Sequence, residues 1–320
     1  MIRFLKLYER FGIFIFIFIG AVFLSFATPN FLKLDTILNI IAQGSYAALV
    51  GYGMTLAITS GGFDLSVESS MGLASVVLAI LIPVAGIPLA ILGGVVAATC
   101  VGVLNGLIIA KLKVNPLITT LGMATIIKGV ALLITSGKMI VIKQREFLAI
   151  GTGKILGIPN PIYIMVAFFV IFYFVVYRSS FGRHVAAVGS NESAARISGV
   201  NVDAVKIGVY ALVALTAGLA SVMRTSQALI GMPSMASGFV LVVLTVTILG
   251  GTSLTGGRAN LWGTMLASSF IAMIYYGLNL INLQIFYQML AVGIVLMLAL
   301  FIEGLRLRFL KAAKAKGIKV

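Results

Sequence analysis

The sequence has 320 residues, of which 61% are apolar and only 10% are charged, and its formal net charge is +15. A water-soluble domain carries about 25% charged residues, so this composition excludes a soluble globular protein and indicates a membrane protein. The basic residues lie between apolar runs and at both ends of the chain, where they suit anionic lipid headgroups rather than nucleic acid.

Ten segments of the chain are long and apolar enough to be membrane spans, since a span needs about 20 mostly apolar residues. The predicted fold is all-α, with about ten transmembrane helices in a single domain over residues 1–320. The first segment resembles a signal peptide, but no A-x-A site follows before Pro29, so we expect a retained helix. The predicted spans are residues 11–28, 36–60, 67–85, 87–110, 115–137, 159–178, 204–224, 236–251, 259–281 and 284–303.

The basic residues also predict the orientation of the chain. With the N-terminus in the cytoplasm, 16 of the 23 Lys and Arg residues fall on the cytoplasmic side, six fall outside, and Lys128 falls within a span. Positively charged loops stay in the cytoplasm, so we expect a multi-pass protein of the bacterial inner membrane with both termini in the cytoplasm. The outer connection 138–158 carries four basic residues and is expected to be a small periplasmic element that meets a partner.

Two short glycine motifs resemble each other. Residues 61–66 read GGFDLS and residues 250–255 read GGTSLT, and both fall on the cytoplasmic side of the predicted topology. A double glycine ends a helix, and Asp, Ser or Thr then caps the next one. The likeness has two interpretations, a coincidence of two turns or an internal duplication of the kind common in transporters.

The connection 179–203 is the longest polar stretch between spans, and it is predicted to be cytoplasmic. It contains a short helix pattern that Asn191 can cap, with Glu192 in the first turn and Gly199 at the position after the helix. The helix has too few apolar side chains for a core of its own. It therefore packs either on its own bundle as a lid or on another protein.

The chain lacks the motifs of most energy-coupling or catalytic sites. It has no G-x-x-x-x-G-K-[ST] loop for ATP and no H-E-x-x-H, and its single cysteine and histidine, Cys100 and His184, cannot build a disulfide or a metal site. We expect no enzyme activity, no cofactor and no metal. All eight acidic residues fall near span ends or in loops, so an ion relay is also missing. Lys128 either reaches the periplasmic interface with its ammonium group or lines the transport path.

Neutral polar side chains remain as candidates for contact with a solute. Amides, hydroxyls and aromatic faces suit an uncharged polyhydroxylated ligand, because they replace its hydrogen bonds to water without burying charge. The same side chains can also join neighbouring helices. The candidates for the translocation path are Gln43, Tyr46, Asp64, Asn105, Thr119, Thr120, Lys128 and Asn279, with Ser45, Tyr275 and Asn282 also in or near spans.

Four blocks resemble the ribose/xylose/galactose-type ABC permeases. Residues 191–200, NESAARISGV, resemble the N-x-x-A-A-R-x-x-G-[IV] loop of that family, and residues 61–67 resemble its GG-[IF]-DLSV segment. Residues 105–122 and 249–258 resemble the two remaining blocks, in the family's order. One departure is Glu68, where the family usually has Gly, and it adds a charge beside the cytoplasmic turn.

The resemblance implies a fold similar to vitamin B12-type importer permeases, working by alternating access as a homodimer or heterodimer. The partners it implies are a cytoplasmic ABC ATPase and a periplasmic or lipid-anchored sugar-binding protein. The connection 179–203 would be the coupling loop, with the ATPase contacts at Asn191, Glu192, Ala194, Ala195, Arg196 and Gly199. The expected function is import of a monosaccharide such as ribose; nucleosides, autoinducer-2 or an ion-coupled sugar carrier are the alternatives.

Overall fold

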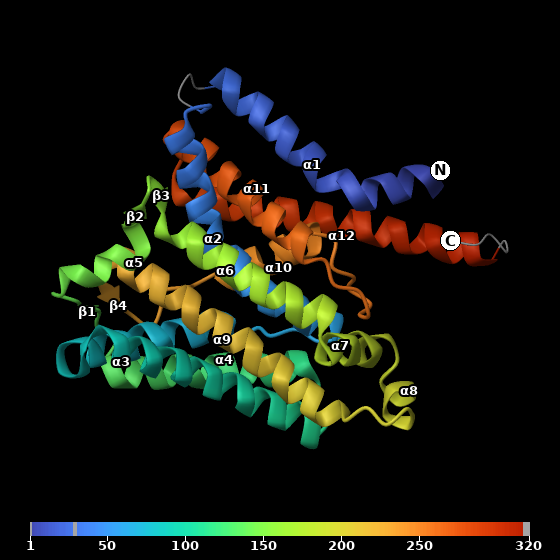
Figure 1. Ribbon diagram of the computed structural model, residues 1–320, viewed down its shortest axis with the longest axis horizontal. Helices are drawn as coiled ribbons and strands as arrows, with labels where there is room; N and C mark the ends of the chain where they lie inside the picture. The colour runs from blue at the N-terminus through green and yellow to red at the C-terminus, as the bar shows by residue number, and fades with distance from the viewer. Residues whose placement is uncertain (1, 28–30, 316–320) are drawn as a thin grey trace.

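The computed structural model of the protein describes residues 2–27 and 31–315. The described chain is mostly helical, as the composition predicts, and adds four strands of two residues each that the sequence did not indicate. The helices form an elongated bundle (Figure 1). Their bounds are α1 (Ile2–Ala27), α2 (Leu34–Thr59), α3 (Val67–Lys111), α4 (Pro116–Thr135), α5 (Leu148–Thr152), α6 (Asn160–Tyr173), α7 (Ser180–Ser190), α8 (Glu192–Ile197), α9 (Val202–Ala228), α10 (Phe239–Leu249), α11 (Leu261–Leu280) and α12 (Ile285–Ala315).

The two ends of the bundle differ in what they carry. The beginning of α1, the end of α12 and helices α7 and α8 lie toward one end, which we call the α8 end (Figure 1). Helix α5 and the strands lie at the opposite end, the strand end. There β1 (Ile140–Val141) pairs antiparallel with β4 (Ile230–Gly231), and β2 (Lys154–Ile155) pairs with β3 (Ile158–Pro159). The connection 138–158 therefore folds into a small element, as predicted.

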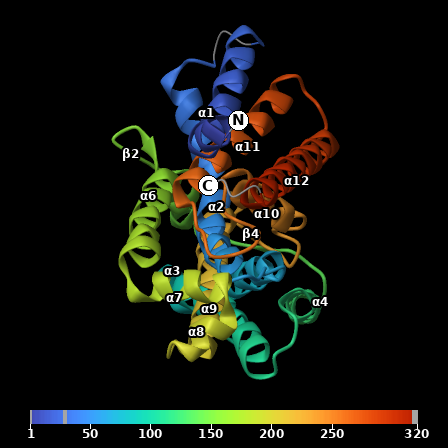
Figure 2. The same ribbon diagram turned by 90° about the vertical axis from the view of Figure 1, so that its right-hand side faces the viewer.

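Helix α2 is the centre of the bundle, and every residue from 44 to 59 is buried (Figure 2). Its neighbours approach its backbone directly: a Cβ atom on Gly44 would lie 2.9 Å from the carbonyl oxygen of Ser268 in α11, and one on Gly53 would lie 2.8 Å from Cα of Val213 in α9. Small residues allow such close helix packing within a membrane. The segment 36–60 is the least apolar of the long predicted spans because it contains glycines and polar residues. The same residues allow α2 to be enclosed by its neighbours.

Helix α3 contains two antiparallel arms rather than one straight rod. Gly86 has φ of 79°, which interrupts the helix, and a Cβ atom on Gly94 would lie 3.1 Å from the carbonyl oxygen of Ala74. Glycine is the residue that adopts this conformation without strain. The arms match the predicted segments 67–85 and 87–110.

The segment 231–238 penetrates the bundle from the strand end as irregular backbone. Its Met232 N–H donates to Ser75 Oγ at 3.3 Å, and its Gly238 N–H donates to Glu68 Oε2 at 3.0 Å, so it runs along α3 toward the first turn of that helix. Helix α10 begins only after this irregular segment, which explains why the predicted eighth span is short. Irregular backbone at such depth is tolerated only where protein or a cavity surrounds it.

Six described helices are long and apolar enough to cross a membrane: α3, α4, α6 with the π-helical turn Phe174–Arg178, α9, α11 and α12. Three helices extend beyond the predicted span boundaries. Helix α1 begins at Ile2, α12 continues to Ala315, and α9 continues to Ala228. Helices α1 and α12 extend into charged segments that were predicted to be loops. A helix can continue beyond the apolar layer of a membrane into a polar environment. Residue 28, the last of the predicted first span, lies outside the described residues.

The close contact between α3 and α9 provides a stability test. A Cβ atom on Gly102 would overlap the carbonyl oxygen of Tyr210 and the Cβ of Ala214. We expect Gly102→Ala to destabilise the fold by about 1–3 kcal/mol through overpacking, seen as a lower thermal midpoint in detergent by size-exclusion chromatography after heating. Gly122→Ala in α4 is the matched control, because nothing lies within 4 Å of its added Cβ. Equal midpoints for the two variants would contradict the packing argument.

Candidate functional site

The α7–α8 connection is built from local caps. The Ser179 hydroxyl accepts from the Gly182 N–H at 3.0 Å at the start of α7, and the Asn191 side chain accepts from the Ala194 N–H at 2.9 Å at the start of α8. Gly199 follows the end of α8 with φ of 83°. The predicted cap and the predicted glycine after the helix are both confirmed, and they fix α8 as a turn-and-a-half of helix between α7 and α9.

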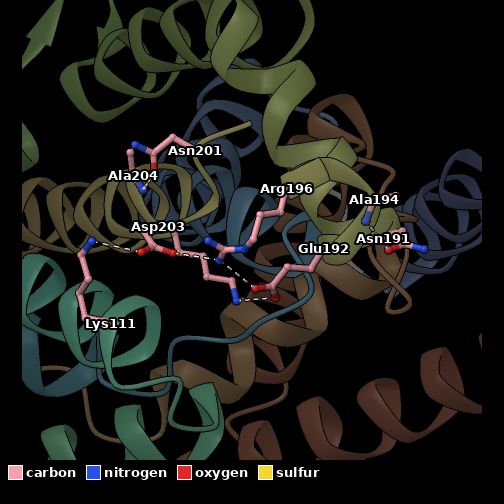
Figure 3. A network of polar contacts seen from close by, with 9 residues as sticks. Lys111, Asn191, Glu192, Ala194, Arg196, Asn201, Asp203 and Ala204 are labelled. Carbon is pink, nitrogen blue, oxygen red and sulfur yellow. Dashed lines mark hydrogen bonds and ion pairs between the residues drawn. The ribbon is translucent and has the colours of Figure 1, made fainter. Parts of the chain in front are cut away.

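Five charged side chains fasten α8 to the ends of α9 and α3 (Figure 3). Lys206 Nζ lies 2.7 Å from Glu192 Oε2, and Glu192 Oε1 lies 3.6 Å from Arg196 Nη2. Arg196 Nη2 in turn lies 3.0 Å from Asp203 Oδ1, and Lys111 Nζ lies 3.1 Å from Asp203 Oδ2. The hydrogen bond from Lys206 is the main reason why the pKa of Glu192 lies below its ordinary value. Single exposed ion pairs contribute little, but alternating charges in a network hold a geometry better.

The six predicted coupling residues have different environments. Ala195 is 5% exposed and packs into the main core, so its side chain faces the protein's own bundle. Asn191 caps α8, Glu192 and Arg196 belong to the charge network, and Ala194 and Gly199 are exposed. Ile197, which the sequence analysis did not select, is 89% exposed. Ile197 is therefore an apolar side chain on the outer surface of α8, next to the charge network.

A cavity of about 620 Å³ lies between α2, α9, α10, α11 and α12, with α5 and the segment 231–238 contributing to its wall. It combines an apolar wall with hydroxyl, amide and basic groups, which is the usual character of a site for a small solute. No Asp or Glu is present in the wall that the described residues form. The polar lining residues are Asn39, Gln43, Tyr46, Thr152, Lys154, Arg224, Gln227, Ser237, Ser268, Tyr275 and Gln288.

Two of the predicted path residues, Gln43 and Tyr46, line this cavity. The Tyr46 hydroxyl donates to Gln227 Oε1 at 3.0 Å, and the Arg224 guanidinium lies over the Tyr46 ring at 5.7 Å from its centroid. Sequence reasoning missed Arg224 and Gln227, because the predicted span ended at residue 224 and left Arg224 in an outer connection. No Gly or Pro occurs between Arg224 and Gly231, and this was the signal for a helix that continues past residue 224.

The other predicted path residues lie elsewhere. Asp64 and Asn105 belong to a fully buried polar cluster near the α8 end: Ser66 Oγ donates to Asp64 Oδ1 at 2.6 Å and accepts from Asn105 Nδ2 at 2.8 Å. Lys128 is exposed on α4 and Asn279 is exposed at the end of α11, where it accepts from Gln288. Thr119 and Thr120 are buried in the first turns of α4. None of these six lines the cavity.

The two glycine motifs both end helices, but in registers that differ by one residue. The left-handed residue is Gly61 in the first motif, directly before Gly62, whereas in the second it is Gly251, directly after Gly250. The residues next to the two motifs meet at the α8 end, where the Gly257 N–H donates to the Thr59 carbonyl at 2.8 Å. The described residues also contain no group of three or more His, Cys, Asp or Glu side chains that could hold a metal ion.

Comparison with known proteins relates the whole bundle to transport proteins. The family model described as branched-chain amino acid transport system / permease component matches residues 36–300. The chain is 37% identical over 299 residues to the ribose import permease protein RbsC of Bacillus subtilis (strain 168), covering 92% of each chain. It is 34% identical over 310 residues to the L-arabinose ABC transporter permease protein AraH of Azospirillum brasilense, covering 97% of this chain and 91% of that one. No solved structure gives a significant match.

The buried cluster around Asp64 predicts a pH-dependent stability. Burial raises the pKa of the Asp64 carboxyl to about 6, although hydrogen bonds from Ser66 and Asn105 oppose the shift. The raised pKa means that folding favours the protonated form, so this stabilisation is full below the unfolded pKa and is lost as pH rises through about 6. We expect the wild type to gain about 1.4 kcal/mol relative to Asp64→Asn between about pH 8 and about pH 5, measured by thermal unfolding. A constant difference would contradict the assignment.

The charge network predicts a local effect on α8. Arg196→Gln removes the link between α8 and Asp203, and we expect amide hydrogen exchange in α8 to become about two to five times faster, as for an exposed ion pair. Arg183→Gln in α7 is the control, because Arg183 is exposed and outside the network. Unchanged exchange in Arg196→Gln, or the same change in both variants, would show that the network does not hold the helix.

Proposed function

The chain belongs to the family of branched-chain amino acid transport system / permease components, and from this premise we propose that it is the membrane-spanning permease subunit of an ATP-driven importer of monosaccharides such as ribose. The observation that carries the proposal is similarity to ribose import permeases over about nine-tenths of the chain, combined with a bundle that has a solute-sized cavity and an exposed helix at one end.

The names of the relatives favour a pentose. RbsC proteins of Bacillus subtilis and Escherichia coli are ribose import permeases, and AraH proteins are L-arabinose permeases. The cavity wall supports an oxygen-rich solute, since amides and hydroxyls can replace its hydrogen bonds to water. Nucleosides and autoinducer-2 remain alternatives as solutes, and a stand-alone ion-coupled sugar carrier remains the alternative mechanism.

The α8 surface supports docking of a cytoplasmic ABC ATPase, which would supply the energy because this chain has no P-loop sequence. Closure of a pair of ATPase subunits would push α8, and the charge network would pass that displacement to α9 and α3. In this proposal Ile197 is the apolar contact, Glu192 and Arg196 set the orientation of α8, and Ala195 anchors it to the bundle.

The strand end supports docking of a periplasmic or lipid-anchored sugar-binding protein. The connection 138–158 and the segment 231–238 form this end, and Gly151, Thr152, Lys154 and residues 235–238 also line the cavity. A sugar released there would enter next to Gln43, Tyr46 and Arg224. The orientation in which the α8 end is cytoplasmic follows from the distribution of basic residues.

The exposed face of α12 supports contact with a second permease copy or a paralogue. Phe286, Met289, Leu290, Met297 and Phe301 are all more than 45% exposed along it, and Met289 also lines the cavity. A neighbour on this face would complete the cavity wall, as expected for a solute path at a dimer interface. We further propose about ten spans in a fold like that of vitamin B12-type importer permeases, in the bacterial inner membrane with both termini in the cytoplasm.

Reconstituted uptake tests the function. The permease, its ATPase and its binding protein are placed in liposomes, and uptake of radiolabelled ribose, L-arabinose and a nucleoside is compared with and without ATP. We expect ATP-dependent uptake of a pentose that requires both partners. Uptake by this chain alone under an ion gradient would overturn the proposal in favour of the ion-coupled carrier, and uptake of the nucleoside alone would change the solute class.

Ile197 gives a sharper test of the ATPase contact. Burying an isoleucine contributes about 1.5–3 kcal/mol, so we expect Ile197→Asp to weaken ATPase binding by at least about tenfold without lowering the thermal midpoint. Leu156→Asp is the matched control, because Leu156 is 93% exposed at the strand end. Binding is measured by copurification and by titration of labelled ATPase. Equal retention of the ATPase by both variants would remove Ile197 from the interface.

A further inference from the structure

Arg224 is held in the cavity by aromatic rings rather than by an acid. Its guanidinium carbon lies 5.7 Å from the ring centroid of Tyr46 in α2 and 5.6 Å from that of Phe239 in α10. Stacking against aromatic faces stabilises a guanidinium and orients its plane. Among the described residues, no carboxylate lies within 4 Å of it and none of its N–H groups donates a hydrogen bond to the protein. Its donors therefore point to solvent or solute.

The other charges near the cavity are either paired with an opposite charge or lie outside its wall. Lys154 lines the wall, but its Nζ lies 3.4 Å from Asp35 Oδ1, so its charge is offset. Glu68 accepts from the Gly238 N–H at 3.0 Å and is not itself a lining residue. Within the part of the chain that the structure describes, Arg224 is thus the one lining charge without a counter-ion at ion-pair distance.

From this arrangement we propose that Arg224 is a specificity-determining residue that gives the cavity a positive potential, donates hydrogen bonds to solute oxygens, and selects neutral or anionic sugars against sugars that carry an amine. The inference rests on the proposed function, because it treats the cavity as the solute path. A guanidinium fork matches a pair of adjacent hydroxyls or a carboxylate, whereas it repels an ammonium group in a partly dehydrated site. Selection by charge would then occur in the permease itself, in addition to any selection by a binding protein.

The charge of the cavity can be measured without transport. Cys100→Ala removes the native thiol, and Ser237→Cys introduces one on the lining. In nanodiscs, the full chain is treated with an anionic reagent, 2-sulfonatoethyl methanethiosulfonate, and a cationic one, 2-(trimethylammonium)ethyl methanethiosulfonate. Each rate is divided by the rate of that reagent with a small free thiol. We expect the normalised ratio of anionic to cationic rates to be at least about tenfold with Arg224 present.

Variants of Arg224 distinguish an effect of its charge on the rate ratio from an effect of a changed structure. Arg224→Met should bring the ratio close to one, and Arg224→Lys should keep it high. The double variant with Asp35→Asn and Lys154→Met is the matched control, because it removes the lining charge of Lys154 together with its counter-ion and should leave the ratio unchanged. If Arg224→Met does not fold, about 1 M salt applied to the chain with Arg224 should lower the ratio by screening.

A ratio near one with Arg224 present, or a ratio that Arg224→Met and salt both leave high, would overturn the proposal. In the reconstituted importer, Arg224→Met should also reduce the discrimination between a pentose and its amino-substituted analogue. Failure of the proposed function is seen separately: the importer would then take up no monosaccharide, while the thiol ratio would still report whether Arg224 sets the charge of the cavity.

Discussion

The close approach of backbones along α2 is the constraint on which the rest of the structure depends. Gly44 and Gly53 bring α11 and α9 into direct contact with this helix, and every residue from 44 to 59 is buried as a result. In a membrane the hydrophobic effect gives helices little reason to associate, so contact area and interhelical hydrogen bonds hold the bundle together. Helix α2 serves both purposes: its glycines set the distances, and its Thr55 hydroxyl bonds to Thr264 of α11 at 3.0 Å. The position of the cavity beside Tyr46 follows from that packing.

Helix α9 joins the two candidate sites in one element. At its beginning Asp203 is bound to Arg196 of α8, and near its end Arg224 and Gln227 line the cavity. Asp203 and Arg224 are 21 positions apart, which is about 32 Å of helix, and no proline lies between them. A displacement of α8 would therefore reach the cavity along a stiff path, and the charge network is where such a displacement enters the bundle.

The sequence predicted the helical segments well because apolar runs of about 20 residues are nearly sufficient to define a helix in a membrane. It also predicted the caps at Asn191 and Gly199, since these depend on neighbouring residues alone. It could not predict the cavity, because Arg224 joins Tyr46 and Phe239 only after three distant helices pack together. The sequence also did not predict that residues 231–238 enter the bundle as irregular backbone, because their hydrogen bonds run to the distant residues Ser75 and Glu68 of α3. Glu68, which departs from the family pattern, accepts from the Gly238 N–H and so holds the residue directly before α10.

The two-residue ladder between β1 and β4 has a consequence for how this protein can change over evolution. It joins two connections that are about 90 residues apart in the chain, and both are continuous with walls of the cavity. A deletion in one connection would pull its strand out of register with the other, and a slip of one residue reverses every side chain in a strand. The two connections should therefore drift in length together among descendants of this chain, although nothing in either one alone suggests that they are a pair.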